Sequence, residues 1–493
     1  MADNTITLAE YLFVRLSQPG CRALHGLPGD FNLTLLDYVE SSGLKWVGNA
    51  NELNAGYATD AYARIHGIGA MCTTFGLGEL SAVNAIAGSY AERVPVVHIV
   101  GTPGRPSQRN GMLLHHTITI AQADLIDPTT APFEIDRVLR TCYIDSQPVC
   151  IQLPTDMVAE SIGAEPLKTP IDVSPHPSNT EAEKLALQIV LDKLYAAKRP
   201  AFLIDGALES SDLIITIGTI QSDLNTTGFT YQISKLNTID IEYDCVQVGY
   251  AKFDKVYFKS FVPPMEQQLD PARLAQTAYS IPKISLHTPV DTESQLITHA
   301  YLWPRVSKFL KLGDFVICDA GTSFVSVWDA VLPRNVQVIN QILWSSIGYG
   351  VGAAQGASLA ARELGKGQRI IVFEGDGSFQ LTAQELSTII HHDLDVTMFV
   401  IENDGYEIER WLHGWEASYN DIPQWQYSKL PEVLTTPDSP HKVRTWRIKT
   451  RSELEALLND STFAEGKGLQ LVEMHMPRGD APKTLRDFAA RRQ

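Results

Sequence analysis

Ile370-Ile-Val-Phe-Glu-Gly-Asp-Gly-Ser378 and Val396-Thr-Met-Phe-Val-Ile-Glu-Asn-Asp-Gly405 are the two stretches that decide the fold of this chain. Each is an apolar run that ends in a turn rich in Gly, Asp and Asn, and a helical pattern connects the two. A strand, a helix and a second strand in this order form a βαβ unit, in which the strands are parallel. The sequence therefore predicts strands over 370–373 and 396–401 in one parallel sheet.

The polar residues at these two strand ends form a candidate ligand site. Asp376 and Asn403 both follow a strand, so they emerge at the same carboxyl edge, where open α/β sheets bind ligands. Their oxygens suit Mg²⁺, which completes its octahedron with phosphate oxygens and water. Gly377 and Ser378 begin the helix, whose free N–H groups favour an anion. Either motif alone could be an ordinary turn, but their pairing on one βαβ unit predicts a magnesium-diphosphate site.

Size and composition describe a large soluble globular protein. A chain of 493 residues is too long for one core, and 44% hydrophobic with 20% charged residues is ordinary for globular domains. The net charge of -17 argues against general binding to nucleic acid or anionic membranes. The sequence shows no basic-then-apolar amino terminus, no long apolar run and no Cys-x-x-Cys among its six cysteines. We therefore expect a cytoplasmic protein with buried free thiols.

Strand and helix patterns alternate through the first and the last thirds of the chain. Residues 1–165 contain predicted strands at 22–26, 45–48, 70–75 and 94–101 and predicted helices at 31–41, 52–66 and 79–91. Residues 294–493 contain further strands at 315–318 and 469–476, helices at 294–312, 348–364 and 452–458, and a helical tail within 478–493. This alternation predicts two doubly wound parallel-sheet α/β domains, each with helices on both faces.

The region between these domains predicts a smaller third one, over 180–285. A Pro-containing connector at 166–177 leads to a predicted helix at 180–198 and strands at 201–205 and 213–218. Only seven residues separate the two strands, whereas a parallel crossover normally takes about a dozen or more. The segment 221–282 has few helical patterns and several short strand-like runs. We therefore expect a shortened middle domain.

Several longer runs resemble one known family. They are Gly26-Leu-Pro-Gly-Asp-Phe-Asn-Leu33, Asn51-Glu-Leu-Asn-Ala-Gly-Tyr-Ala-Thr-Asp-Ala-Tyr-Ala-Arg64, Leu113-Leu-His-His-Thr117, Leu343-Trp-Ser-Ser-Ile-Gly348 and Asn403-Asp-Gly-Tyr-Glu-Ile-Glu409. Together with the βαβ motif, they make nearly the whole chain similar to the thiamine diphosphate-dependent pyruvate decarboxylases and related 2-keto acid decarboxylases, most like the fungal branch. The resemblance implies a thiamine diphosphate-binding fold and a carboxy-lyase that forms an aldehyde and CO₂ through an ylid and an enamine.

The resemblance also implies roles for particular residues. The implied metal ligands are Asp376, Asn403 and the carbonyl of Gly405. The implied cofactor-binding residues are Thr322, Ser345, Ile347, Gly375, Asp376, Gly377, Ser378, Asn403 and Gly405. The implied catalytic residues are Glu52, Asp30, His115, His116 and Glu409. Without the resemblance, we would interpret Glu52 as a carboxylate at a helix start and Asp30 as a turn aspartate. The His115-His116 pair would be part of a polar loop, and Glu409 would be a solvated helix residue.

Glu52 has the most specific implied role, because in this family the glutamate hydrogen-bonds the aminopyrimidine ring and so activates the cofactor. Such a carboxylate must be desolvated in order to share a proton at neutral pH. In the family, the cofactor lies between the first domain of one subunit and the last domain of another. The resemblance thus implies a homodimer or homotetramer and a small 2-keto acid as substrate, and the net charge predicts no nucleic acid or membrane partner.

The sequence departs from the family pattern in three places. The middle domain is shorter, Ala320 stands where threonine is common, and Phe324 stands where alanine is common in pyruvate-specific enzymes. Pyruvate is the default substrate, and a decarboxylase of indolepyruvate or phenylpyruvate is the first alternative. An acetohydroxyacid synthase fits less well, because the His115-His116 pair and Glu409 belong to the decarboxylase branch. A catalytically impaired paralogue with a truncated middle domain remains an alternative.

Overall fold

A computed structural model describes residues 5–108, 118–202, 211–219, 226, 234–274, 294–365, 367–436, 438–441 and 443–492. Internal contacts divide the chain into two compact units. The larger unit joins Met1–Asp172 to Leu286–Gln493, and the smaller one is Val173–Ser285. We call the two parts of the larger unit its N-terminal half and its C-terminal half. The division into three domains at residues 165, 180, 285 and 294 stays a prediction.

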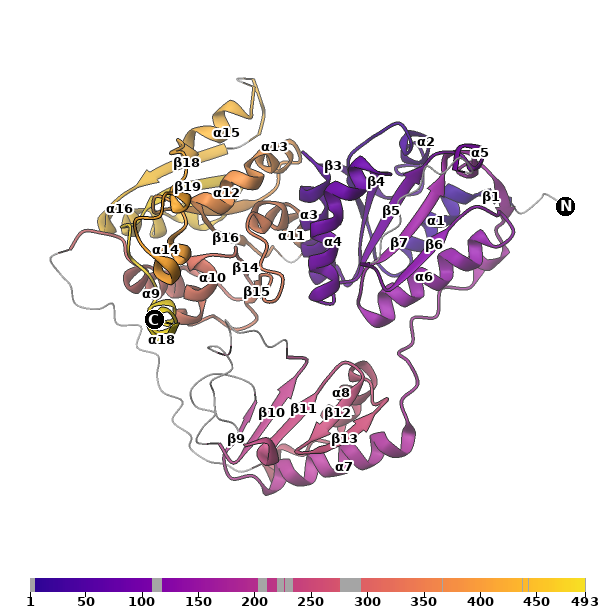
Figure 1. Ribbon diagram of the computed structural model, residues 1–493, viewed down its shortest axis with the longest axis horizontal. Coiled ribbons are helices and arrows are strands. Elements are labelled where there is room, and N and C mark those ends of the chain that lie inside the picture. The colour runs from indigo at the N-terminus through magenta and orange to yellow at the C-terminus, as the bar shows by residue number, and fades with distance from the viewer. Residues whose placement is uncertain are drawn as a thin grey trace. The chain divides into compact units, whose positions relative to one another are not determined.

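The N-terminal half is built on a six-stranded sheet whose neighbouring strands are all parallel. The strand order is β3 (Lys45–Gly48), β2 (Ala23–Gly26), β4 (Gly69–Thr74), β5 (Val96–Thr102), β7 (Val149–Pro154) and β6 (Ala121–Asp124). Helices α1 (Leu8–Ser17) and α6 (Ala131–Asp145) cover one face, and α3 (Glu52–His66) and α4 (Leu77–Ala91) cover the other (Figure 1). Shorter elements are β1 (Thr5–Thr7), β8 (Ser161–Gly163), α2 (Leu33–Leu36) and α5 (Arg105–Gln108).

The C-terminal half repeats this topology. Its parallel strands are ordered β15 (Gln337–Ile339), β14 (Phe315–Cys318), β16 (Ile370–Gly375), β17 (Val396–Glu402), β19 (Leu469–His475) and β18 (Val443–Ile448). One face carries α11 (Tyr349–Leu364), α12 (Asp376–Thr382) and α13 (Leu386–His391), and the other α9 (His299–Phe309), α16 (Arg451–Leu458) and α17 (Ser461–Ala464). The remaining helices are α10 (Thr322–Ser326), α14 (Glu407–His413), α15 (Leu430–Val433) and α18 (Lys483–Arg492). Counted along the chain, the strands of both sheets have the order 2-1-3-4-6-5.

The two halves meet where α3 packs against α11 (Figure 1). Glycines on α11 permit this close approach. A Cβ atom at Gly352 would lie 2.8 Å from the Tyr57 Cβ, and one at Gly356 would lie 1.9 Å from the carbonyl oxygen of Ala58. Larger residues at these two positions would therefore push the helices apart.

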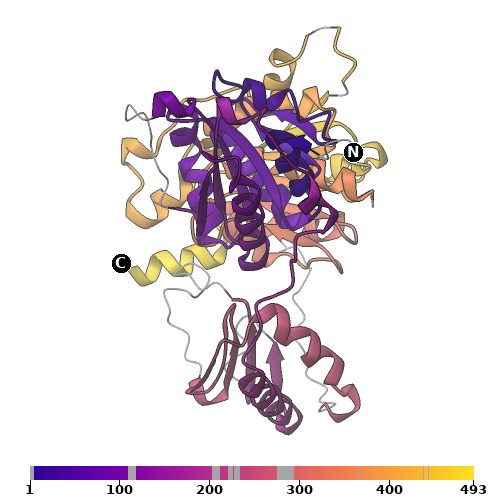
Figure 2. The same cartoon turned by 90° about the vertical axis from the view of Figure 1, so that its right-hand side faces the viewer.

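In its described residues, the smaller unit is a five-stranded mixed sheet with two α-helices. Its order is β13 (Ala251–Asp254), β12 (Cys245–Val248), β11 (Thr238–Ile241), β10 (Leu213–Ile217) and β9 (Pro200–Phe202). Helices α7 (Thr180–Ala196) and α8 (Phe258–Gln268) pack on the same side of this sheet (Figure 2). Strands β9 and β10 are parallel although the connection between them is short. Strand β9 is described as far as Phe202, and the last predicted residues of this strand, 203–205, fall in 203–210, outside the described part.

Most predicted elements are present within a few residues of their expected bounds, and one differs clearly. The helix predicted at 31–41 is a single turn, Leu33–Leu36, followed by further turns as far as Gly43. The Asn32 side chain does not cap this helix, because it accepts from the Gly29 N–H and donates to the Leu27 carbonyl. In the described residues, every helix is too short or too polar to cross a lipid bilayer.

Candidate active site

Three neighbouring strands of the C-terminal half end at one edge of the sheet, and the predicted ligand residues follow them. Strand β14 leads to Thr322, β16 to Asp376 and β17 to Asn403. The Ser378 Oγ donates to the Ala320 carbonyl at 3.1 Å, which joins the first two strand ends. The backbone N–H of Asn403 donates to the Asp376 Oδ2 at 3.2 Å, which joins the second and the third. The structure therefore brings these predicted residues together.

Asp376 is a buried carboxylate held by backbone donors. Its side chain accepts from the N–H groups of Gly377 at 2.8 Å, Asn403 at 3.2 Å and Gly405 at 3.1 Å. Burial nevertheless raises the pKa of Asp376 to about 7, because desolvation outweighs these three donors. A bound cation would favour the charged form of this carboxylate, as Mg²⁺ does for its ligands.

The Asn403 side chain offers a second oxygen at this edge. The residue is 6% exposed, and within the described part of the chain its amide makes no hydrogen bond. The amide oxygen is therefore available to a ligand at this edge. Asp376 and Asn403 together thus fit a hard cation such as Mg²⁺.

Gly405 completes this turn because only glycine fits there. Its φ is +120°, and a Cβ atom would lie 2.2 Å from the Asn420 carbonyl oxygen and 3.0 Å from the Arg410 Nη2. The preceding Asp404 also has a positive φ, of +73°. The backbone of this turn is therefore tightly constrained.

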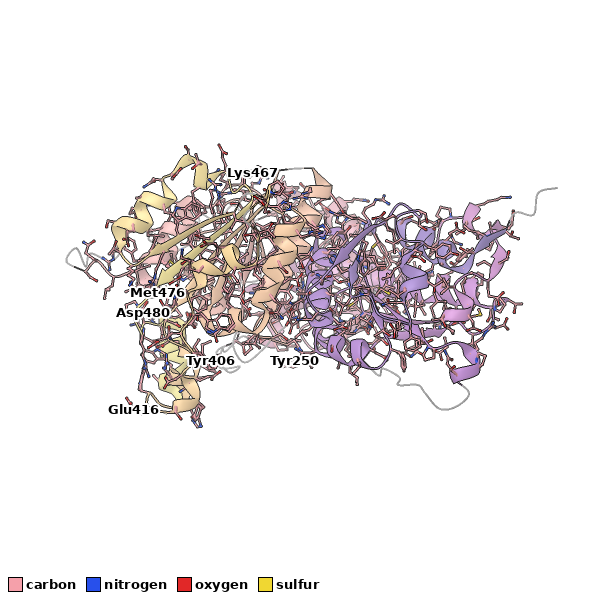
Figure 3. All side chains as sticks on the ribbon, turned by 90° about the horizontal axis from the view of Figure 1, so that it is seen from above. Tyr250, Tyr406, Glu416, Lys467, Met476 and Asp480 are labelled. Atoms are coloured by element: carbon pink, nitrogen blue, oxygen red, sulfur yellow. The ribbon has the colours of Figure 1, made fainter. Side chains whose placement is uncertain are left out.

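The glycines at the strand ends differ in the space around them, where a diphosphate is expected. Gly321 and Gly375 face open space, whereas Gly377 is closed off by a side chain. A Cβ atom at Gly321 or Gly375 would meet no atom within 4 Å. At Gly377, in contrast, a Cβ atom would lie 2.5 Å from the Tyr406 ring, so glycine is required. Tyr406 lies at the end of the C-terminal half that α14 and α18 occupy (Figure 3). These glycines fit an anionic group beside the strand ends.

Ser345 and Ile347 lie on the loop that joins β15 to α11, next to the same edge. The Gly348 N–H at the end of this loop donates to the Asp319 Oδ2 at 2.9 Å. Ser345 adopts a left-handed φ of +52°, which is uncommon for a residue with a side chain. Ile347 remains 41% exposed. The loop therefore presents an apolar side chain at a constrained position.

Of the predicted catalytic residues, Glu409 lies on α14 soon after the Asn403–Gly405 turn, and the others belong to the N-terminal half. Glu52 is the first residue of α3 and is half-buried, and a Cβ atom at Gly78 would lie 2.9 Å from its Oε1. Asp30 and Glu409 are exposed. In the described residues, no hydrogen bond or ion pair joins Glu52 or Asp30 to Asp376. His115 and His116 fall in 109–117, outside the described residues.

Two buried carboxyl groups beside this edge were not predicted. Asp319 and Glu374 are both fully buried, on the adjacent strand ends of β14 and β16. Burial raises the pKa of both, and that of Glu374 lies well above its ordinary range. Asp319 accepts from the N–H groups of Gly348 and Gly350, so it is the ionised member and Glu374 is the protonated one. Their positions directly after apolar runs were the only signal in the sequence.

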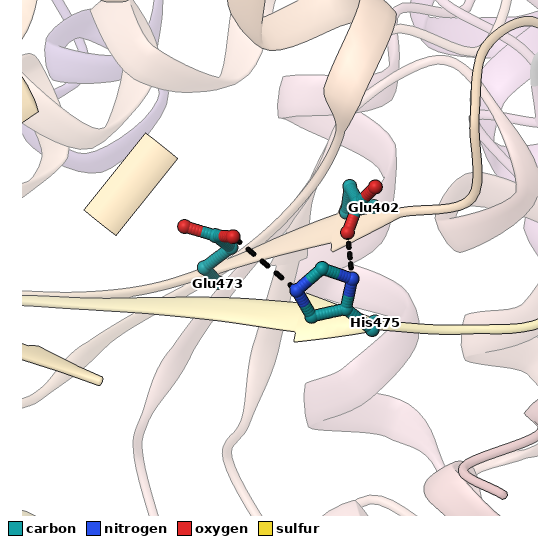
Figure 4. A group of neighbouring side chains, drawn as sticks. All are labelled: Glu402, Glu473 and His475. Atoms are coloured by element: carbon teal, nitrogen blue, oxygen red, sulfur yellow. Dashed lines mark ion pairs between the residues drawn. The ribbon is translucent and has the colours of Figure 1, made fainter. Parts of the chain in front are cut away.

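A separate cluster lies at the ends of β17 and β19, formed by Glu402, Glu473 and His475 (Figure 4). His475 forms ion pairs with both glutamates, through Nδ1 to Glu402 and through Nε2 at 3.3 Å to Glu473. The Arg447 Nε lies 2.8 Å from both the Glu473 Oε1 and the His475 Nε2. Since Arg447 already pairs with Glu473 and donates to the His475 Nε2, and His475 lies against both glutamates, we interpret this group as an ion-pair network rather than a metal site.

Two domain families match the chain. The family described as "Thiamine pyrophosphate enzyme, N-terminal TPP binding domain" matches residues 6–124. The family described as "Thiamine pyrophosphate enzyme, C-terminal TPP binding domain" matches residues 319–474, which include all three strand ends. These matches confirm the predicted fold class, two thiamine diphosphate-binding α/β domains.

Similar proteins span nearly the whole chain. Pyruvate decarboxylases of Aspergillus fumigatus and Aspergillus terreus are each 43% identical over 98% of this chain and 96% of their own lengths. Pyruvate decarboxylase isozyme 1 of Saccharomyces cerevisiae is 36% identical over 98% of this chain and 97% of its own length.

This chain belongs to the pyruvate decarboxylase family. The predicted resemblance to its fungal branch is thereby confirmed. As a member of this family, the chain is a thiamine diphosphate-dependent carboxy-lyase that uses Mg²⁺. The buried oxygens of Asp376 and Asn403 and the open space at Gly321 and Gly375 fit that pair of cofactors.

The chain is shorter than these relatives. The alignment with the Aspergillus fumigatus enzyme extends over 553 positions, but 98% of 493 residues is only about 483. About 70 positions of the alignment are therefore occupied by the relative alone.

Proposed function

We propose that this member of the pyruvate decarboxylase family converts pyruvate, without oxidation, into acetaldehyde and CO₂. The observation that carries the proposal is the buried ligand set of Asp376 and Asn403 beside Gly405, on a chain similar from end to end to proteins named pyruvate decarboxylase.

In this proposal the C-terminal half holds the cofactors. Asp376, the Asn403 amide and the Gly405 carbonyl bind Mg²⁺, and Thr322, Gly375, Gly377 and Ser378 surround the diphosphate. Ser345 and Ile347 contact the organic part of the cofactor, where the exposed Ile347 side chain provides an apolar support. Bound thiamine diphosphate supplies the electron sink that lets a 2-keto acid lose CO₂.

The N-terminal half supplies most of the proton chemistry, and Glu409 of the C-terminal half contributes to it. Glu52 holds a proton at the pyrimidine ring of the cofactor, a task that requires a desolvated carboxylate. Asp30, His115, His116 and Glu409 transfer protons to the substrate carbon and from the product oxygen, since aldehyde release needs both movements.

We further propose a homodimer or homotetramer with its active sites between subunits. Glu52 is only half-buried in the single chain, so its full desolvation requires another surface. Helix α4, whose Gly78 lies against Glu52, exposes two large apolar side chains, Leu77 at 84% and Leu80 at 58%, which a second copy could cover. This arrangement would place Glu52 of one chain near Asp376 of another.

The proposal includes the domain division and the location. The family matches at 6–124 and 319–474 fall inside the proposed domains 1–165 and 294–493. We assign the missing residues to the middle domain, 180–285, where the connection between β9 and β10 is short. A cytoplasmic location is supported by six buried cysteines that are all free thiols.

A second candidate function is decarboxylation of indolepyruvate or phenylpyruvate. It is favoured by Phe324, which is 2% exposed and whose ring lies 5.9 Å from that of Trp328. Two neighbouring aromatic rings next to Thr322 would suit an aromatic substrate. The shortened chain keeps a third candidate open, a catalytically impaired paralogue.

An aldehyde-coupled assay on a panel of 2-keto acids tests all three candidates. We expect the highest kcat/KM with pyruvate, and a rate lower by about 10²–10⁴-fold in the Glu52→Gln variant. A higher value with phenylpyruvate or indolepyruvate would favour the second candidate. A folded protein that binds thiamine diphosphate and Mg²⁺ in calorimetry without turnover would favour the impaired paralogue.

A further inference from the structure

Arg410 is a fully buried arginine directly behind the turn that carries Asn403 and Gly405. It lies on α14, and its side chain is 0% exposed. The Nη1 donates to the Asn403 carbonyl at 3.4 Å, and the Nη2 donates to the Asp404 carbonyl. One guanidinium therefore holds two successive peptide groups of the turn.

The same turn is held from its other side by Asp376. The N–H groups of Asn403 and Gly405 both donate to the Asp376 Oδ2, whereas the carbonyl groups of Asn403 and Asp404 face Arg410. A Cβ atom added at Gly405 would lie only 3.0 Å from the Arg410 Nη2, so the guanidinium also packs against the turn. A planar group with a fixed fork of donors is suited to fixing two carbonyl groups at once.

The charge of Arg410 is neutralised within the described residues. The Nη1 lies 3.2 Å from Glu407, which is 1% exposed, and the Nη2 lies 3.0 Å from Asp421. Glu407 also accepts from the Gly479 N–H at 2.8 Å. A buried guanidinium is stable only with such partners, and here they connect α14 to the segment that leads into α18.

We infer that Arg410 is a positioning residue for the metal site, which fixes the Asn403–Gly405 turn so that its oxygens face the same cation as Asp376. The inference rests on the proposed function, which assigns Asn403 and Gly405 to the metal. Arg410 itself contacts neither substrate nor cofactor in this proposal. Partners of metal ligands that act in this way typically change metal affinity by about 10–100-fold when replaced.

Arg369 is a matched control in the same half. Its side chain is 7% exposed, and it donates to the carbonyl groups of Phe309 at 3.0 Å and Ala464 at 2.9 Å while pairing with Asp314. It precedes β16, whose opposite end leads to Asp376, so it lies at the amino edge of the sheet. Replacing Arg369 removes similar interactions without touching the turn.

The experiment compares R410Q and R410K with R369Q and R369K in the full-length protein. Mg²⁺ is titrated calorimetrically in the presence of thiamine diphosphate, and amide hydrogen exchange over 403–405 is measured in the protein without cofactors. We expect the Mg²⁺ Kd to rise about 10–100-fold in R410Q and less in R410K, because one ammonium cannot hold both carbonyl groups. The Arg369 variants should keep the wild-type Kd within about twofold, although their thermal stability falls too.

Faster exchange confined to the Arg410 variants would support the inference, even where R410Q is too unstable for titration. Equal Mg²⁺ affinity in R410K and wild type with unchanged exchange over 403–405 would overturn it. Equal weakening by the Arg369 variants would overturn it as well, since the effect would then be general destabilisation. If wild type binds no Mg²⁺ with thiamine diphosphate, the proposed function fails instead, and the exchange data still decide whether Arg410 holds the turn.

Discussion

Glu385 in the C-terminal half accepts a hydrogen bond from the Asn49 side chain in the N-terminal half, with 2.7 Å between Oε1 and Nδ2. Its other oxygen accepts from the Ala50 N–H at 3.1 Å. Glu385 closely follows α12, which begins at Asp376, and Asn49 and Ala50 closely precede Glu52. One buried carboxyl group thus ties the segment that carries the proposed metal ligand to the segment that carries the proposed activator.

Replacing Glu385 by alanine should weaken the contact between the halves. Glu385 is 0% exposed, and its removal leaves the buried Asn49 amide with the Gln355 Oε1 at 3.2 Å as its remaining acceptor and deprives the Ala50 N–H of its acceptor. We expect the free energy of unfolding to fall by about 1–3 kcal/mol in total, as measured by denaturant unfolding. Glu385→Gln should lose less, because its amide oxygen still accepts one bond. The exposed Glu432→Ala should change stability by less than about 0.5 kcal/mol, and an equally small effect at Glu385 would contradict the prediction.

Replacing Asp376 by asparagine should abolish tight binding of Mg²⁺ with thiamine diphosphate. The amide keeps the size of the side chain but lacks the charge that a divalent cation requires. Both Asp376 oxygens accept from backbone N–H groups and the asparagine Nδ2 cannot accept, so we also expect the protein without cofactors to lose about 1–3 kcal/mol of unfolding free energy. Calorimetry with both cofactors and a thermal unfolding curve without them provide the two measurements. Wild-type affinity in this variant would exclude Asp376 as the ligand.

Local signals in the sequence predicted the regular elements well where those signals were strong. Helix α3 has its predicted bounds, because Asn51 caps its start through a bond to the Asn54 N–H and Gly67 ends it at a φ of +88°. The helix at 31–41 was overestimated, because the Asn32 side chain is used by the preceding turn. Apolar periodicity does not reveal such competition.

Some residues of the site could likewise be predicted from local sequence signals, and others could not. Asp376 and Asn403 could be placed together because parallel strands fix which ends share an edge. The burial of Glu374 against Asp319 and the contacts of Arg410 depend on which helices pack behind the edge, and no short motif encodes that packing. Arg410 follows the Asn403 motif closely in sequence, but the sequence alone predicts an ordinary exposed arginine on a helix at this position.

The Glu52→Gln variant should lose turnover while it keeps the cofactors. A glutamine cannot hold or release a proton, and loss of a general acid-base group typically lowers the rate by about 10²–10⁴-fold. The metal ligands lie in the other half, so the Kd values for thiamine diphosphate and Mg²⁺ should stay close to those of wild type. A single-turnover assay and calorimetry on the same sample separate the two effects. Wild-type turnover in this variant would remove Glu52 from the proposed chemistry.

His299 should make the stability of the protein depend on pH below neutrality. The ring is 2% exposed, its Nδ1 lies 3.0 Å from the Ser326 Oγ, and burial lowers its pKa to about 3. In the unfolded chain the ring takes up a proton near pH 6.5, so its contribution is fully present above that pH and is lost as the pH falls towards 3. The loss is about 1.4 kcal/mol per pH unit, or roughly 2 kcal/mol at pH 5. Between pH 5 and 8, the free energy of unfolding should therefore depend less steeply on pH in the His299→Gln variant than in wild type. Parallel curves for the two proteins would refute this prediction.

Phe324→Ala should shift the substrate preference towards aromatic 2-keto acids. If the buried ring limits the space beside Thr322, its removal opens room for a phenyl group, and we expect the ratio of kcat/KM for phenylpyruvate to that for pyruvate to rise at least about tenfold. The cavity also costs about 3–5 kcal/mol of stability, so thermal unfolding must be followed alongside the kinetics. Phe324→Leu is the control, because it removes the ring but keeps most of the apolar volume, and it should shift the ratio less. A falling ratio in Phe324→Ala would instead show that the ring stacks on an aromatic substrate, which would favour the phenylpyruvate or indolepyruvate function over pyruvate decarboxylation.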